Sequence, residues 1–404
     1  MRWFSLFLVL AMTLAAPVAH AQQGFTALAR LTGKGVTLTE RRGRVEIDLE
    51  ISQTVPWRVF TLTDPARVVV DFSELDWGGT NGAALAQGVS RIAGIATGVF
   101  RPGWSRMVIA LDRPMAVDEA GMTGTGTGAR VTIRLRDTDA ESFAASAGAP
   151  PSATFDLAET TPAAPTPRAD GPFVVVLDPG HGGIDPGAER DGVIEADLML
   201  TFARDLREVL LRSGNIDVVL TRDGDYFVPL EERVSIARRA GADVFLSLHA
   251  DALAEGRATG ATVYTLAEEA SDLASEKLAE RHDRADLLAG VDLSETDDAV
   301  ALVLMDMART ETRPRTARLA SALVEGIYAA TRSTYKTPLM EAAFSVLKAP
   351  DIPSVLIELG FLSSERDLAN LTDPGWRRAA AEGIRDALLY WEIEDAAAAE
   401  RLRK

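Results

Sequence analysis

The sequence predicts a small all-β sandwich followed by an α/β domain, in which helices cover a twisted, mainly parallel sheet. Three observations predict this fold class. Apolar and polar residues alternate with period two in the first third of the chain, short aliphatic runs alternate with helical patterns after residue 172, and a proline-rich segment separates the two regions. The chain has 404 residues, and single cores stop growing near ~250–300 residues, so two domains are expected.

The first 21 residues have the pattern of a secretory signal. Arg2 precedes the apolar run Phe4–Val18, and Ala19-His20-Ala21 has the form of a cleavage site. We therefore expect export to the periplasm and cleavage after Ala21. The apolar run is shorter than the ~20 residues that span a bilayer, and no later segment is as apolar. No membrane span is expected after signal cleavage.

Net charge limits the kind of partner that is expected, and cysteine content limits how the fold can be stabilised. The net charge is −17, and binding to a phosphate backbone depends on clustered Lys and Arg, so nucleic acid is excluded as a partner. The chain has no cysteine. An exported protein of this composition has to rely on core burial rather than on disulfides.

Residues 24–137 are expected to form the β-sandwich. Apolar residues alternate with polar ones over 45–51 and over 131–135, which is typical of strands with one buried face. Further strands are predicted over 57–62, 67–72 and 106–111, separated by Pro, Gly and Asp turns. The Ala/Pro-rich residues 138–172 follow as a semi-extended linker.

Residues 173–392 are expected to form the α/β domain, with a C-terminal tail over 393–404. Aliphatic runs predict strands over 174–179, 217–222, 244–250, 261–266 and 354–360. Helical spacing of apolar residues predicts helices over 195–212, 229–240 and 374–392, and a long helical region over 268–332. Strands that alternate with helices in this way indicate a mainly parallel sheet covered on both faces.

Two of the four histidines, His181 and His249, follow aliphatic runs that are expected to be buried strands. Ligands gather beyond the carboxyl ends of such strands, so both imidazoles should emerge at one edge of the sheet. Glu195, in the first turn of a predicted helix, supplies a third ligand. Two histidines and one glutamate, with a position left for water, are the ligand set of a hydrolytic zinc enzyme. His282 lies in a charged helical segment and fits no such site.

Glu358 ends another aliphatic run and precedes a turn at Gly360. A buried carboxylate has to be paired or take part in chemistry, so the residues alone leave a structural ion pair and a catalytic role both open. The glycine-rich segment 180–183 lacks the Gly-Lys-Ser/Thr ending of a phosphate-binding loop. Its small residues instead allow the backbone to pass close to a metal.

Four blocks resemble the zinc-dependent N-acetylmuramoyl-L-alanine amidases that trim bacterial peptidoglycan, and they occur in family order: Asp178–Gly183, Glu195, Ser247–Asp251 and Ile357–Ser363. The resemblance implies one zinc per chain, held by His181, Glu195 and His249. It also implies that Glu358 is the general base, and that the enzyme cuts between N-acetylmuramic acid and L-alanine of the stem peptide during septal wall splitting.

The strand pattern of residues 24–137 is similar to that of AMIN domains, which implies recruitment to peptidoglycan without a part in the chemistry. Two other functions stay open. One is a catalytically degenerate cell-wall binding or adaptor protein, which the retained ligands and Glu358 disfavour. The other is a related metal-dependent peptidoglycan deacetylase or endopeptidase, because metal chemistry does not determine which amide is presented.

Residues 268–310 form an insertion that resembles the regulatory segment of division-associated amidases. The resemblance implies a helix that blocks the active site until an activator with a LytM-type domain displaces it. The candidate inhibitory carboxylates are Glu268, Glu269, Glu276 and Glu280. A plain solvated helix would carry similar charges. The apolar run Val300–Met307 is either a surface for a partner helix or part of a buried core helix.

Overall fold

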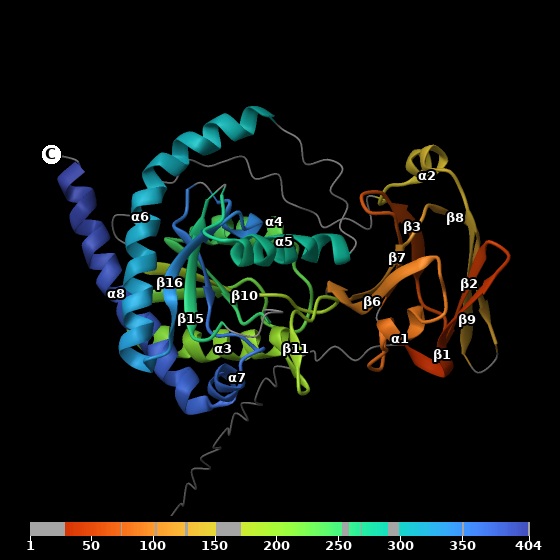
Figure 1. The fold of residues 1–404 in the computed structure, drawn as a ribbon, viewed down its shortest axis with the longest axis horizontal. Helices are drawn as coiled ribbons and strands as arrows, with labels where there is room; N and C mark the ends of the chain where they lie inside the picture. The colour runs from red at the N-terminus through yellow and green to blue at the C-terminus, as the bar shows by residue number, and fades with distance from the viewer. Residues whose placement is uncertain are drawn as a thin grey trace, which may run out of the picture.

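The structure is a computed structural model, and it describes residues 29–73, 75–101, 103–125, 128–150, 171–252, 258–267, 269–289, 299–349 and 351–402. Over 299–311 it describes the backbone alone. The predicted signal sequence and most of the predicted linker lie outside these residues. A β-rich domain and a larger helix-covered sheet lie side by side (Figure 1).

The N-terminal domain has two sheets, with strand orders β5-β1-β2-β9-β8 and β3-β4-β7-β6. The strands are β1 Ala29–Arg41, β2 Arg44–Ile51, β3 Trp57–Leu62, β4 Arg67–Ser73, β5 Leu75–Asp76, β6 Ile92–Arg101, β7 Trp104–Leu111, β8 Met115–Gly124 and β9 Ala129–Asp137. A short helix, α1, spans Gly82–Ala86. The apolar residues of β2 and β9 point into one core with those of β4 and β7, as the alternation predicts.

The chain after β9 differs from the predicted linker. Residues Ala140–Ser146 form a helix, α2, because Asp139 caps its N-terminus by accepting a hydrogen bond from Ser142 N at 2.7 Å. Phe143 is 2% exposed and packs into the sandwich core. The sandwich domain therefore includes residues that the composition alone assigned to a linker.

The C-terminal domain has a six-stranded sheet with the order β13-β10-β14-β17-β15-β16. The strands are β10 Phe173–Pro179, β13 Ile216–Leu220, β14 Val244–His249, β15 Ala261–Leu266, β16 Thr334–Ala342 and β17 Ser354–Glu358, and a small hairpin joins β11 Glu189–Arg190 to β12 Val193–Ile194. Strands β13, β10, β14 and β17 are parallel, whereas β15 runs antiparallel to β17. The register pairs His249 with Glu358, so β14 and β17 end level at one edge.

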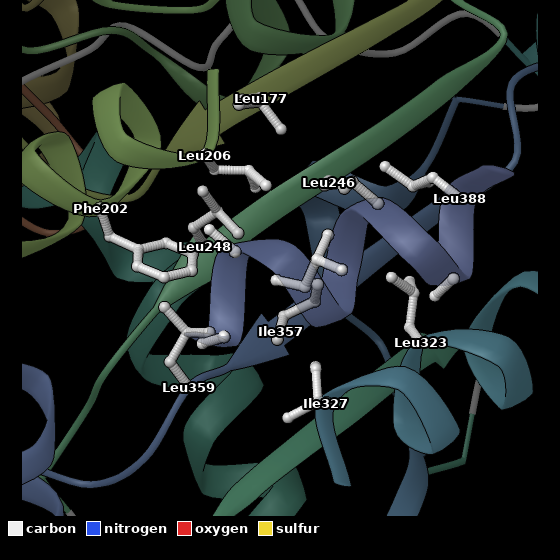
Figure 2. Close-up of a cluster of buried hydrophobic side chains, with 14 of the residues drawn as sticks. Leu177, Phe202, Leu206, Leu246, Leu248, Leu323, Ile327, Ile357, Leu359 and Leu388 are labelled. Atoms are coloured by element: carbon white, nitrogen blue, oxygen red, sulfur yellow. The ribbon is translucent and has the colours of Figure 1, made fainter. Parts of the chain in front are cut away.

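Helices cover both faces of this sheet. They are α3 Glu195–Leu211, α4 Leu230–Ala240, α5 Leu273–Leu288, α6 Ala299–Thr331, α7 Glu365–Thr372 and α8 Pro374–Leu402. Helices α3, α6 and α8 bury the larger core, in which Phe202, Leu323 and Leu388 surround the strand residues (Figure 2). Helices α4 and α5 pack on the opposite face, against residues such as Phe245. Burial on both faces explains why the strands read as continuous aliphatic runs.

Three elements depart from the predicted outline of this domain. The helical region expected over 268–332 is divided between α5 and α6, and an unpredicted edge strand, β16, follows it. Helix α8 continues to Leu402, through most of the expected tail. Within the part of the chain that the structure describes, no helix is both long and apolar enough to cross a membrane.

Candidate active site

The three predicted metal ligands lie together at the carboxyl edge of the sheet. His249 is the last residue of β14, His181 follows β10 by two residues, and Glu195 is the first residue of α3. The Glu195 Oε1 atom lies 3.3 Å from His181 Nε2 and 3.2 Å from His249 Nδ1. One carboxylate oxygen therefore lies close to a ring nitrogen of each histidine.

These separations fit a zinc ion. A tetrahedral zinc with nitrogen and oxygen ligands at about 2.0–2.1 Å holds neighbouring ligand atoms roughly 3.3 Å apart. His181 Nε2 is also buried without a hydrogen-bond partner. A metal bound between these atoms would satisfy that nitrogen, so the three residues fit a zinc ion and their role as its ligands stays a prediction.

Neighbouring groups fix the orientation of each ligand. His181 Nδ1 lies 2.7 Å from Asp185 Oδ2, which leaves Nε2 as the ring atom that faces the other ligands. The backbone amides of Ala188 and Ala250 donate to the two oxygens of Glu195, each at 2.9 Å. Asp185 has no predicted role, and its position four residues after His181 is the only sequence signal for this contact.

Two buried arginines hold the loop that carries His181. Arg233 donates to Asp178 Oδ1 at 2.7 Å and to the His181 carbonyl at 3.0 Å, and Arg222 donates to the Gly180 carbonyl at 2.8 Å. A Cβ atom at position 180 would lie 2.2 Å from the His249 ring, so only glycine fits there. The loop thus passes as close to the ligands as the sequence predicts.

Burial and charge give the two histidines different pKa values. Burial, aided by the nearby His282, lowers the pKa of His249 to about 3, so this ring stays neutral and able to bind a metal. Burial acts in the same direction on the pKa of His181, but Asp185 and Glu195 outweigh it and raise that pKa well above the usual value. Metal binding must displace this proton, so metal affinity should fall as the pH is lowered.

Glu358 lies beside the ligand cluster at the end of β17. Its Oε2 atom accepts a hydrogen bond from Asp251 N at 3.0 Å, whereas Oε1 is buried without a partner. Burial, together with the charges of Glu195 and Asp251, raises the pKa of Glu358 well above its usual value. A carboxyl group with such a pKa can accept a proton and hold it.

Comparison with known proteins shows the family to which this chain belongs. Residues 175–390 match the Amidase_3 family, described as N-acetylmuramoyl-L-alanine amidase, and residues 35–135 match the AMIN domain. The chain is 30% identical over 369 residues to the N-acetylmuramoyl-L-alanine amidase AmiC of Escherichia coli O6:H1 (strain CFT073), covering 88% of each protein. The chain belongs to the Amidase_3 family.

Two further comparisons each cover about half of this Amidase_3 chain. AmiA of Escherichia coli K12, another N-acetylmuramoyl-L-alanine amidase, is 38% identical over 226 residues, which cover 55% of this chain and 78% of AmiA. The crystal structure of an N-acetylmuramoyl-L-alanine amidase from Clostridium difficile 630 aligns with a TM-score of 0.42 and 25% identity, covering 55% of this chain and 97% of that one.

His282, which the sequence analysis assigned to no such site, is a second residue that sequence reasoning missed. It projects from α5, is 4% exposed, and its ring centroid lies 4.1 Å from that of His249 and 5.6 Å from that of His181. Nitrogen atoms of all three rings lie within 4.8 Å of one another. Neither His282 nitrogen has a hydrogen-bond partner, and Nε2 lies 3.8 Å from Glu358 Oε1.

Polar contacts hold α5 across the site. Arg281 donates to both oxygens of Asp251, at 2.7 and 2.8 Å, and Asp283 accepts from Ser345 N at 2.9 Å. Asp286 accepts from Leu230 N at 3.0 Å, where α4 begins, and burial raises the pKa of Asp286 to about 7. Described residues around the ligands leave a cavity of about 20 Å³, which is room for about one water molecule.

The described members of the set of predicted inhibitory carboxylates do not join this cluster. Glu269, Glu276 and Glu280 are exposed, and Glu268 lies outside the described residues. On α5 the buried positions include 275, 278, 279, 282 and 286, so His282 faces the sheet while Glu276 and Glu280 face solvent. The side chains of the apolar run Val300–Met307 also lie outside the described residues, so its predicted role as a partner surface stays a prediction.

Proposed function

We propose that this chain is an exported zinc-dependent N-acetylmuramoyl-L-alanine amidase that cuts between the lactyl group of N-acetylmuramic acid and L-alanine of the stem peptide. The convergence of His181, Glu195 and His249 beside Glu358 carries the proposal. One zinc ion per chain, held by the first three, would polarise the scissile carbonyl and acidify water. Septal wall splitting is the expected role, as for the family that the sequence resembles.

In this proposal Glu358 carries the proton. The Oε1 atom is buried without a hydrogen-bond partner, 3.8 Å from His282 Nε2, and it accepts the proton of the attacking water. The same carboxyl then gives the proton to the nitrogen of L-alanine as the amide bond breaks. The high pKa of Glu358 favours this second step, and a nearby dication would favour the ionised form that the first step needs.

Digestion of purified sacculi tests the substrate. The expected products are free stem peptides that begin with L-alanine and glycan strands that keep intact N-acetylmuramic acid, both identified by mass spectrometry. Release of acetate would instead identify a deacetylase, and cuts between amino acids would identify an endopeptidase. If the metal-loaded protein released no product even with α5 displaced, the hypothesis of a wall-binding adaptor protein would be favoured.

Export and wall targeting complete the proposal. The first 21 residues direct the chain to the periplasm, and cleavage follows Ala21. The match of residues 35–135 to the AMIN domain supports recruitment to peptidoglycan by the sandwich.

The proposal includes autoinhibition by α5. His181 and His249 are 10% and 7% exposed in their side chains, and Glu358 is fully buried, so a glycopeptide has no access in this arrangement. His282 supplies an imidazole close enough to take the position that substrate and water need. Relief requires a partner that binds the displaced state better than the closed one. A LytM-type activator is the candidate that the resemblance implies.

His282→Ala should raise hydrolysis of sacculi by about tenfold or more, because losing ~1.4 kcal/mol from the closed state shifts the closed-to-open ratio tenfold. Metal content should stay unchanged. The visible spectrum of the cobalt-substituted protein should change, because the His282 imidazole is no longer beside the metal. Glu276→Ala and Glu280→Ala, on the exposed side of the same helix, serve as controls and should behave like the parent. A folded, metal-loaded His282→Ala protein that is no faster would remove autoinhibition from the proposal.

A further inference from the structure

The sandwich packs against the catalytic domain beside the metal site, with β6 directed towards the catalytic domain (Figure 1). One apolar cluster crosses the boundary, with Phe100 and Val108 from the sandwich and Ile184, Phe227 and Ala289 from the catalytic domain. All five are at most 3% exposed. The rings of Phe100 and Phe227 stack with centroids 6.2 Å apart. The boundary is therefore a packed, apolar contact.

Glycines let the two backbones approach closely at this contact. A Cβ atom at Gly98 would lie 2.5 Å from the Cα of Ile184, and one at Gly183 would lie 2.0 Å from the Val99 carbonyl oxygen. Phe227 N donates a hydrogen bond to the same oxygen at 3.3 Å. Larger residues at either glycine would push the domains apart, so the local sequence on both sides suits docking.

Arg106 connects the sandwich to the end of α5. Its guanidinium is 1% exposed, donates to both oxygens of Asp71 at 2.6 and 2.9 Å, and lies 3.3 Å from the ring centroid of Phe100. The remaining Nη1 atom donates to the Ala289 carbonyl oxygen at 3.1 Å. The last carbonyls of a helix lack partners within the helix and favour positive charge, so Arg106 stabilises the C-terminal end of α5.

The contacts at Ala289 and at Ile184 both involve segments that also contribute residues to the metal site. Ala289 lies on the same buried side of the α5 segment as His282, about two turns further on. Ile184 adjoins Asp185, which orients His181. Anything that separates the sandwich from the catalytic domain therefore disturbs the helix that covers the ligands and the loop that holds one of them.

We propose that the sandwich is a clamp that holds α5 closed over the metal site, so that undocking the sandwich activates the enzyme. This inference rests on the proposed inhibition by α5. It departs from the expectation that the N-terminal domain only recruits the enzyme, because a recruiting domain needs no capping contact with α5. The docked contact adds its free energy to the closed state, and removing it shifts the protein towards the open one.

The test compares two substitutions in one strand of the full chain. Gly98→Leu places a side chain against Ile184 and should undock the sandwich, whereas a Cβ at Gly94 meets no described atom within 4 Å, so Gly94→Leu is the matched control. We expect Gly98→Leu to raise hydrolysis of soluble muropeptides about tenfold. Undocking removes the hydrogen bond from Arg106 to α5, and loss of one charge-assisted hydrogen bond shifts an equilibrium by about that factor. Hydrogen exchange in α5 should rise with it, and Gly94→Leu should change neither quantity.

The outcomes separate this inference from the inhibition on which it rests. If His282→Ala is faster but Gly98→Leu leaves the rate and the α5 exchange at parent values, the clamp is wrong and the inhibition stands. Faster α5 exchange in both variants without a gain in rate would overturn the inhibition and the clamp together. A slower Gly98→Leu protein would mean that the sandwich supports catalysis, which also overturns the clamp. If Gly98→Leu does not fold, Arg106→Leu provides the same comparison by removing the bond to Ala289.

Discussion

His249→Ala is expected to abolish metal binding and amide hydrolysis together. Its Nδ1 atom is one of three donors that converge, and two remaining donors leave a site that cannot compete for zinc at low concentration. Elemental analysis after dialysis should show metal at background in His249→Ala and near one equivalent in the parent. His282→Ala is the matched control, because it removes an equally buried imidazole but keeps all three ligands.

Asp185→Ala should give an intermediate result. The metal ligands stay, but His181 loses the carboxylate that orients its ring, which typically costs about 10–100-fold in metal affinity. Chelator competition measures that loss. Full metal occupancy in a protein that lacks both His181 and His249 would show that the metal is held elsewhere, and the assignment of the site would then be wrong.

The sequence predicts the sheet and the positions of the candidate ligands for the same physical reason. Parallel strands buried on both faces need continuous aliphatic runs, so the ends of β14 and β17 are visible in the sequence. His249 and Glu358 stand at those ends, and parallel register brings them together. Glu195 follows because the first turn of α3 faces the same edge. The positions of these residues could be predicted from the local sequence pattern and from the rule that parallel strands end at the same edge of a sheet.

His282 could not be found in this way because its place depends on how α5 docks. The helix carries charges on most of its surface, so its buried side is marked only by the spacing of small and apolar residues such as Leu278 and Ala279. Arg106 is a similar case, since its contact with Ala289 joins residues 183 positions apart. Long-range contacts of single polar side chains produce no periodic pattern in the sequence. Helix α2 was missed for a different reason, because its N-terminal cap and the burial of Phe143 outweigh its linker-like composition.

Glu358→Gln should keep the metal and lose most of the rate. Glutamine retains an oxygen that can accept from Asp251 N but cannot take a proton from water, so the rate should fall by about 10²–10⁴-fold. Hydrolysis of muropeptides should be compared with the parent, both in the full chain and with His282→Ala in each protein, so that closure by α5 does not mask the difference. Metal content, measured on the same samples, should stay near one equivalent.

Stability provides the control for this variant. A carboxyl group whose pKa is raised in the folded protein contributes stability that is present below its unfolded pKa and is lost as the pH rises through its folded pKa. Glutamine carries no charge, so at pH 8 the thermal midpoint of Glu358→Gln should equal or exceed that of the parent. A lower midpoint would mean that the rate is lost because the variant unfolds. A stable, metal-loaded Glu358→Gln protein with full activity would mean that another group accepts the proton.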